Sequence, residues 1–310
     1  MNSKNREPVN WAGVMPAVTT PFDERGAVDH SFLGKHCSWQ VDHGATGIIP
    51  CGSLGEGATL TIDEKVEMLK VVVEAVGDRV PVIPGIAALS TAEAVRFSEL
   101  SQEVGCRGLM VLPPYVHRGP WTETAAHIET LLEATDLPCI LYNNPQAYGV
   151  DIVPEVIAEL ASRHDQLRAV KESSGDTRRV TAVKALVGDR LSVFAGLDDM
   201  IVEAVRQGAS GWVAGLVNAL PSESVKLFDL AVAGLEDRQA AERADALYRW
   251  FLPLLRLDVV PEFVQLIKLV QQEVGRGNER VRMPRQEVGG VLRETALATI
   301  RNSLQSNPLN

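Results

Sequence analysis

Short apolar runs alternate with amphipathic segments along the first two thirds of the chain. Each run is followed by a stretch with helix-like spacing, and several of these stretches end at a glycine, as at Gly105, Gly188 and Gly208. Short apolar runs are typical of parallel strands that are buried on both faces. Eight such runs occur, at residues 12–18, 47–52, 80–86, 108–112, 138–142, 167–171, 191–196 and 211–216. Eight βα units of this length predict a (β/α)8 TIM barrel, an α/β fold.

The amphipathic segments carry ordinary helix signals. A helical pattern covers residues 29–43 and ends at Gly44, and the segment that begins at Thr61 repeats valine and leucine at helical spacing. A third helix is predicted from Thr91. A doubly wound sheet is the alternative architecture for such alternation. No G-x-G-x-x-G motif follows the first apolar run. This absence disfavours a doubly wound sheet that binds a dinucleotide.

The pattern changes after the eighth run, where the chain reads as wholly helical. One barrel helix needs far fewer residues than remain, so the surplus predicts a helical extension packed on the barrel. The expected organisation is a barrel over residues 1–221, carrying the active site, and a helical domain over 222–310. Candidate helices cover residues 222–234, 237–256, 260–275 and 285–304.

Composition narrows the class of function. The 310 residues are 45% hydrophobic and 23% charged, with a net charge of −10 and a sequence pI near 5.2. This balance is that of an ordinary globular protein, and the lack of a basic cluster argues against nucleic acid as a partner. No uncharged stretch is long enough to cross a membrane, and we expect no signal peptide in the polar residues 1–10. The four cysteines form no C-x-x-C pair, so we expect reduced thiols in a cytoplasmic protein.

Lys171 stands out because it ends an apolar run. The run at residues 167–171 is followed at once by Glu172, two serines, a glycine and an aspartate. A buried ammonium group is costly, and neutral amines form when burial lowers an amine pKa. A neutral lysine amine is what Schiff-base chemistry requires. The alternative is a strand-end lysine that reaches solvent, which is the commoner situation for a lysine considered alone.

Other strand ends supply matching chemistry. Tyr142 ends the run before that of Lys171, so neighbouring parallel strands can hold the phenol beside the amine, where it can transfer protons. Residues 52–56 (GSLGE) form a turn whose backbone N–H groups can bind a carboxylate, and Ser53 adds a hydroxyl group. The alternatives are a half-buried strand-end tyrosine and a turn whose glycines serve geometry alone.

Several other chemistries find no support. The six histidines form no H-x-x-x-H or Cys/His ligand set, which disfavours a metal-dependent aldolase and predicts no metal site. No P-loop and no G-x-S-x-G motif is present. Glu56 and Glu172 could be acid–base groups, although glutamates in such turns usually start helices or form ion pairs.

These segments together resemble the dihydrodipicolinate synthase / N-acetylneuraminate lyase superfamily, a group of Schiff-base lyases. The resemblance extends over nearly the whole chain, and its motifs are specific in combination. They are residues 13–22, 52–56 (GSLGE), 112–115 (LPPY), 142–145 (YNNP), 170–176 (VKESSGD) and 195–199 (AGLDD).

The resemblance implies roles for individual residues. Lys171 would form the Schiff base without a cofactor, Tyr142 would move protons beside it, and Ser53 and Leu54 would bind the substrate carboxylate. Tyr115 matches a tyrosine that completes the proton relay across a subunit interface, which implies a homo-oligomer, commonly a dimer of dimers. Further substrate-binding positions are expected in the matched segments, at Asn143, Ala147, Gly196 and Val213.

One departure from the family pattern bears on the substrate. Dihydrodipicolinate synthases have an arginine shortly after the tyrosine motif, and Ala147 stands at that position. Without a guanidinium group there, binding of the second substrate's carboxylate is in doubt. Residues 143–151, 51–56 and 211–218 are most similar to bacterial 1-pyrroline-4-hydroxy-2-carboxylate deaminases of hydroxyproline breakdown.

The expected substrate is therefore a small 2-oxo acid or its cyclic imine, and the favoured reaction is dehydration and deamination of the hydroxy-pyrroline. The alternatives are an aldolase or dehydratase of 2-keto-3-deoxy sugar acids, dihydrodipicolinate synthase, and a barrel-fold binding protein without catalysis. The intact pair of Lys171 and Tyr142 argues against the last of these.

Overall fold

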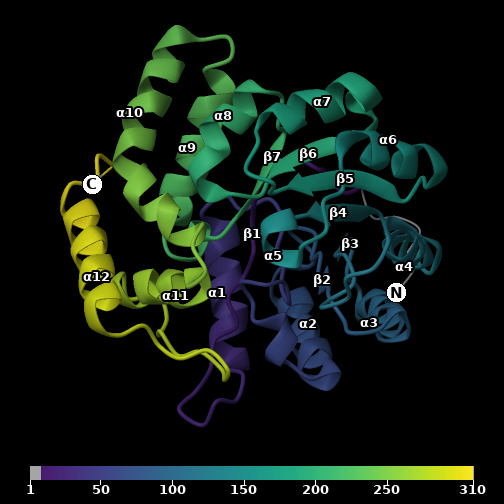
Figure 1. The fold of residues 1–310 in the computed structure, drawn as a ribbon. Coiled ribbons are helices and arrows are strands. Elements are labelled where there is room, and N and C mark those ends of the chain that lie inside the picture. Colours follow the sequence, from purple (N-terminus) through teal and green to yellow (C-terminus); the bar gives the residue numbers. More distant parts are fainter. Residues whose placement is uncertain (1–7, 310) are drawn as a thin grey trace.

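A curled parallel sheet lies at the centre of the molecule and helices surround it (Figure 1). The computed structural model describes residues 8–309. Residues 1–7 of the polar segment in which we expect no signal peptide, and Asn310, lie outside the described residues. The seven strands pair in the order β1-β7-β6-β5-β4-β3-β2. They are β1 (Gly13–Pro16), β2 (Gly85–Ile86), β3 (Leu109–Val111), β4 (Cys139–Asn143), β5 (Leu167–Glu172), β6 (Ser192–Ala195) and β7 (Gly211–Ala214).

The second apolar run, residues 47–52, joins the two edges of this sheet. Ile49 forms a parallel bridge with Ala17, just beyond β1, and Ile48 forms one with Val82, just before β2. Its backbone bonds follow the same course, with the Ile49 N–H donating to Pro16 O and the Ile48 N–H to Pro81 O, both at 2.9 Å. The result is a TIM-barrel-like α/β fold, as the alternating pattern predicts.

The helices begin where the sequence places capping residues. The Thr61 side chain accepts from the Glu64 N–H, and the Glu64 carboxylate accepts from the Thr61 N–H, which together form a capping box. Asp29 and Ser90 cap the helices predicted near residues 29 and 91 in a similar way. The helices that follow the strands are α1 (His30–Asp42), α2 (Ile62–Val76), α3 (Thr91–Val104), α4 (Trp121–Glu133), α5 (Pro145–Tyr148), α6 (Pro154–Arg163), α7 (Arg178–Val187) and α8 (Ile201–Arg206).

The last third of the chain is helical, as predicted. It contains α9 (Pro221–Ala233), α10 (Arg238–Leu255), α11 (Phe263–Glu273) and α12 (Gly290–Gln305). The first of these helices, α9, packs against β1, α8 and α10. The last helix, α12, packs against α10 and α11 beside the barrel (Figure 1). Two connections in this region, a short 3-10 helix at Arg256–Asp258 and the segment that follows α11, pass the carboxyl ends of the strands.

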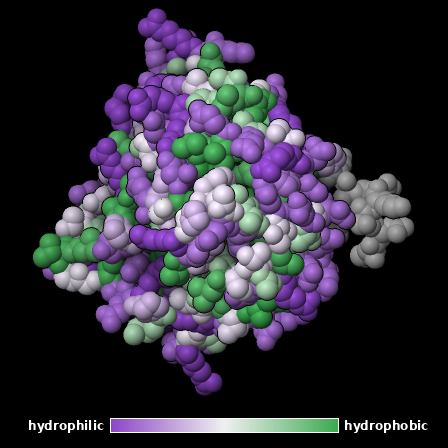
Figure 2. Space-filling model, turned by 45° about the vertical axis from the view of Figure 1, so that its right-hand side comes forward, coloured by the Kyte–Doolittle hydropathy of each residue, from purple (hydrophilic) through white to green (hydrophobic). Residues whose placement is uncertain are grey.

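The interior is apolar and the surface is mixed. All four cysteines are buried and free, and burial raises the pKa of Cys37, Cys51 and Cys139 to about 12, so these thiols are inert. Within residues 8–309, no helix has the length and apolar character needed to cross a bilayer. Figure 2 shows apolar side chains scattered among hydrophilic ones on one face.

Candidate active site

A cavity of about 470 Å³ opens at the carboxyl ends of the strands. Parallel barrels place their sites at this end, because the loops that follow the strands converge there. The cavity is lined by eight of the nine residues that the sequence singles out, namely Ser53, Leu54, Tyr115, Tyr142, Ala147, Lys171, Gly196 and Val213. The structure therefore brings together residues that are up to 160 positions apart in the chain (213 − 53).

Lys171 and Tyr142 lie side by side on neighbouring strands. They are register partners in the pairing of β4 with β5, and each side chain is 6% exposed. The Lys171 Nζ lies 4.2 Å from the centre of the Tyr142 ring. Among the described residues, no carboxylate forms an ion pair with this amine. The amine is therefore buried beside a phenol and faces the cavity, which is the arrangement that Schiff-base chemistry requires.

Gly196 makes room for the lysine side chain. A methyl group at this position would overlap the Ser173 hydroxyl and would lie 2.8 Å from Lys171 Cε. The backbone of β6 can approach the lysine so closely only because Gly196 has no Cβ.

The turn at residues 52–56 is held in an uncommon backbone conformation. Cys51, which precedes it, and Glu56, its last residue, have φ angles of 62° and 53°. Non-glycine residues with such angles cost about 1–3 kcal/mol each and cluster at functional sites. Within the described part of the chain, no acceptor takes the backbone N–H groups of Ser53 and Leu54. These two donors are therefore available to a carboxylate in the cavity.

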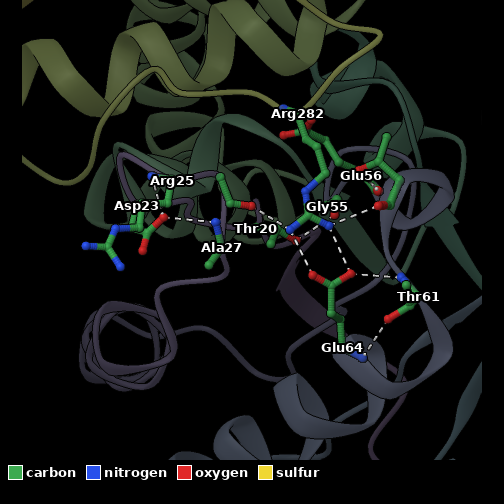
Figure 3. Close-up of polar contacts among 11 residues, drawn as sticks. Thr20, Asp23, Arg25, Ala27, Gly55, Glu56, Thr61, Glu64 and Arg282 are labelled. Carbon is green, nitrogen blue, oxygen red and sulfur yellow. Dashed lines mark hydrogen bonds and ion pairs between the residues drawn. The ribbon is translucent and has the colours of Figure 1, made fainter.

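Buried polar contacts fix this turn to the rest of the molecule. Thr20 Oγ1 donates to Gly55 O at 2.6 Å, and Lys268 Nζ from α11 lies 2.6 Å from Glu56 Oε1. The Arg282 N–H donates to the other Glu56 oxygen at 3.0 Å. Figure 3 shows the Arg282 side chain reaching down to Glu64, which caps α2. Glu56 therefore forms a buried structural ion pair. This agrees with the expectation that glutamates in such turns form ion pairs, and not with a role as an acid–base group.

The Ser53 hydroxyl group is hydrogen-bonded to the hydroxyl group of Tyr148, a residue that the sequence analysis did not select. The Tyr148 ring lies edge-on to Tyr142 at 5.6 Å between centroids, and 5.7 Å from the ring of Tyr115. Burial raises the pKa of Tyr148 well above its usual value, so the phenol stays neutral. In the sequence, Tyr148 could have been found from its position six residues after Tyr142, within the matched residues 143–151.

Two adjacent asparagines have different surroundings. Asn144 lines the cavity, and its Nδ2 donates to the Tyr142 hydroxyl at 3.0 Å. Asn143, expected to bind substrate, instead donates to Glu172 Oε2 at 3.0 Å and accepts from the Ile152 N–H. Asn143 is fully buried and lies outside the cavity lining. Glu172 also accepts from the Ser174 N–H, so the two side chains shape the end of β5.

Two aspartates, buried Asp198 and half-buried Asp258, differ in what surrounds them. Asp198 accepts hydrogen bonds from Trp212 Nε1 and from the Gly215 and Leu216 N–H groups. Asp258 lines the cavity, and among residues 8–309 no group donates to its carboxyl. Burial raises the pKa of Asp198 to about 6 and that of Asp258 well above its usual range, with the charge of Asp198 acting in the same direction. Because only Asp198 has donors, we assign the shared proton to Asp258.

A cationic group also borders the cavity. Arg285, from the segment that follows α11, lines it, and no carboxylate in the described ranges forms an ion pair with this guanidinium. Its positive charge acts to lower the pKa of Tyr115, against the larger effect of burial. Arg285 is thus available to a second negative group on a ligand.

No histidine is among the described residues that line this cavity. His36 is buried and lies 3.4 Å from Asn218 Oδ1, and burial lowers its pKa to about 4. Within residues 8–309, no cluster of three histidine, cysteine, aspartate or glutamate side chains could hold a metal ion.

Comparison with known proteins agrees with the geometry. The sequence pattern of the dihydrodipicolinate synthetase family matches residues 10–302. The 4-hydroxy-tetrahydrodipicolinate synthase of Pelobacter propionicus is 30% identical over 292 residues, which cover 94% of this chain and 98% of the relative. The enzyme of that name from Geobacter sulfurreducens is 36% identical over 233 residues, which cover 75% of this chain and 79% of the relative.

Solved structures share the fold. Dihydrodipicolinate synthase from Aquifex aeolicus superposes with a TM-score of 0.87 at 27% identity and covers 95% of this chain and 97% of its own. The same enzyme from Acinetobacter baumannii, solved with pyruvate, gives a TM-score of 0.88 at 25% identity and covers 95% of this chain and 99% of its own.

Proposed function

The chain belongs to the dihydrodipicolinate synthetase family, and from this premise we propose that Lys171 is the amine that forms its Schiff base. The family forms this imine between a lysine and pyruvate, and its chemistry needs no cofactor. One observation carries the proposal: Lys171 Nζ lies in the cavity, 4.2 Å from the Tyr142 ring and without an ion-pair partner among the described residues. The substrate class is a small 2-oxo acid or its cyclic imine.

The neighbouring residues would orient such a substrate. Its carboxylate would accept from the free N–H groups of Ser53 and Leu54, which places C2 toward the lysine. Tyr142, whose hydroxyl is oriented by Asn144, would move protons between nitrogen and oxygen. The protonated imine would then withdraw electrons and acidify C3.

Within this class we propose 1-pyrroline-4-hydroxy-2-carboxylate deaminase. Two features of the cavity support it. Ala147 leaves no cation at the position where dihydrodipicolinate synthases have arginine. Asp258 places a carboxylic acid in the cavity, and cleavage of the C4–O bond requires such a proton donor.

The proposed reaction balances with a single water molecule. Lys171 attacks C2 of the cyclic imine, and the ring opens to leave a free amine at C5. Loss of the C3 proton and of the C4 hydroxyl, protonated by Asp258, releases one water. Two proton shifts, from C5 to C3 and from nitrogen to C4, then convert the C5 amine to an imine. Hydrolysis of this imine releases ammonia and hydrolysis at C2 frees Lys171, which consumes two water molecules. The products are ammonia and 2,5-dioxopentanoate.

A substrate panel tests this assignment. We expect ammonia from the hydroxy-pyrroline, measured by a coupled glutamate dehydrogenase assay, and slow or no condensation of pyruvate with aspartate semialdehyde. Rapid condensation without ammonia release would contradict the assignment. Cleavage of 2-keto-3-deoxy sugar acids to pyruvate would instead identify the aldolase.

The second candidate is 4-hydroxy-tetrahydrodipicolinate synthase, the name that the relatives carry. Arg285 favours it, because its free guanidinium could bind the carboxylate of a second substrate in place of the missing arginine. Under this candidate, Arg285→Ala would raise the KM for aspartate semialdehyde. The hydroxy-pyrroline has one carboxylate, which Ser53 and Leu54 already satisfy.

We also propose the organisation that the family resemblance implies: a barrel over residues 1–221, a helical domain over 222–310, and a homo-oligomer, as a dimer of dimers. Two exposed apolar side chains near the cavity support an interface there. Leu89 is 74% exposed and Val116 is 81% exposed, and the Tyr115 N–H donates to Ala88 O between their loops. Sedimentation equilibrium showing only a 33.6 kDa species would contradict the oligomer.

A further inference from the structure

Tyr148 occupies a place in the cavity that the family resemblance leaves without a role. It ends α5, a single turn that begins directly after the Tyr142 strand. The Asn144 side chain accepts from the Ala147 N–H at 3.0 Å, and Gly149, at φ 70°, donates to Pro145 O. This capped turn brings the phenol of Tyr148 back over the end of β4 and toward Ser53.

The contacts of Tyr148 are those of a group in a proton relay. Its hydroxyl is bonded to that of Ser53, and its ring packs against Tyr142 and Tyr115 at 5.6 and 5.7 Å. The serine that would stand beside the substrate therefore has its phenol partner within the same chain.

We propose that Tyr148 completes the proton relay of Ser53 in cis, in the role that the resemblance gives to Tyr115 of a neighbouring subunit. The inference rests on the proposed Schiff base at Lys171. Tyr148 acts through Ser53, so it is a positioning and relay residue. A site built in this way does not depend on a partner subunit for its hydroxyl chain.

The proton balance of the first step shows what the relay must do. A neutral lysine amine and a ketone give a protonated imine and water when one further proton is supplied. The N–C2 bond forms, the C2–O bond breaks, and the departing oxygen takes one proton from nitrogen and one from the relay. Ser53 can pass a proton to that oxygen as it receives one from Tyr148. In the next step the relay runs in reverse and accepts the C3 proton. Each proton that Tyr148 gives is returned, so no charge is left over.

Exchange of the pyruvate methyl protons with deuterium measures this relay directly, because it requires imine formation and loss of the C3 proton. We compare Tyr148→Phe, which keeps the ring and its packing, with Tyr115→Phe in the full-length protein by proton NMR. Removing a general acid–base group costs about 10²–10⁴-fold. We expect Tyr148→Phe to slow exchange by about 100-fold, at the low end of that range, and Tyr115→Phe to slow it less.

Two further measurements separate a relay from a structural role. If Ser53 and Tyr148 act as one unit, the double variant Ser53→Ala/Tyr148→Phe exchanges scarcely more slowly than the slower single variant. If the two residues act independently, the losses in exchange rate of the single variants multiply. Tyr248→Phe is the matched control, because this fourth tyrosine bonds Glu203 and the Asp199 carbonyl, outside the cavity lining. We expect it to exchange at the wild-type rate.

The outcomes also separate this inference from the proposed function. Exchange by Tyr148→Phe at the wild-type rate, or multiplicative losses in the double variant, would overturn the relay while leaving the Schiff base intact. Borohydride trapping of pyruvate on Lys171 checks the latter in each variant. A wild-type protein that forms no adduct would overturn both.

Discussion

At the scale of single residues, the site depends on which groups keep their protons. Asp198 and Asp258 face the same region, but three different N–H donors stabilise the charge of Asp198 alone. Asp258 therefore keeps the proton, as the direction of its pKa indicates. A carboxylic acid held neutral in this way can serve a reaction that expels hydroxide, because it protonates the leaving oxygen.

The first prediction concerns Asp258. Because its pKa is raised, the acid form persists above the usual range of aspartate, and turnover falls as pH rises through that raised value. Asp258→Asn removes the donor, so we expect ammonia release to fall by about 100-fold and the alkaline limb of the pH profile to change. Borohydride trapping on Lys171 should continue in this variant. An unchanged rate of ammonia release would refute the role of Asp258.

At the scale of elements, a buried ion pair joins the carboxylate-binding turn to the C-terminal helices. Lys268 on α11 and Glu56 are each 1% exposed, and Lys268 Nζ also donates to Arg280 O at 2.7 Å. The ammonium lies 4.5 Å from the Phe22 ring centre. Breaking a buried pair is costly, because the remaining charge has no partner. The C-terminal helices therefore help to hold the turn that carries Ser53 and Leu54.

The second prediction follows from that pair. Lys268→Met leaves Glu56 buried and unpaired, so we expect the free energy of unfolding in urea to fall by about 3–5 kcal/mol. Adding Glu56→Gln should recover part of the loss, because the uncompensated charge is removed. Lys184→Met is the matched control, since Lys184 pairs with a fully exposed Asp189, and it should change stability by less than about 1 kcal/mol. Equal losses of unfolding free energy in Lys268→Met and Lys184→Met would show that the buried pair contributes no more to stability than the exposed pair.

At the scale of the whole molecule, the alternation of apolar and amphipathic segments predicts the TIM-barrel-like α/β architecture that the structure shows, with seven strands in place of the expected eight. Parallel strands form within seven of the eight apolar runs. The second run makes only isolated bridges, and β2 spans two residues. Prolines at positions 50, 81 and 84 explain the weakness there, because proline has no N–H to donate to a sheet.

The residues that line the cavity were predictable only where strands end. Lys171 and Tyr142 follow from that rule, since their strands are neighbours and their side chains share one mouth. Asp258 and Arg285 come from connections between C-terminal helices, and no spacing along the chain shows which surface such a connection covers. Tyr148 reaches the cavity because one capped helical turn, α5, reverses the direction of the chain. These three positions required the tertiary structure.

The central claim is that Lys171 forms a covalent imine with a 2-oxo acid, and borohydride reduction tests it most directly. The protein is treated with sodium borohydride in the presence of pyruvate or of the hydroxy-pyrroline, digested, and sequenced by mass spectrometry. We expect one reduced adduct on the peptide that carries Lys171, and none in Lys171→Ala. No adduct with either compound, or an adduct on a different lysine, would contradict the account.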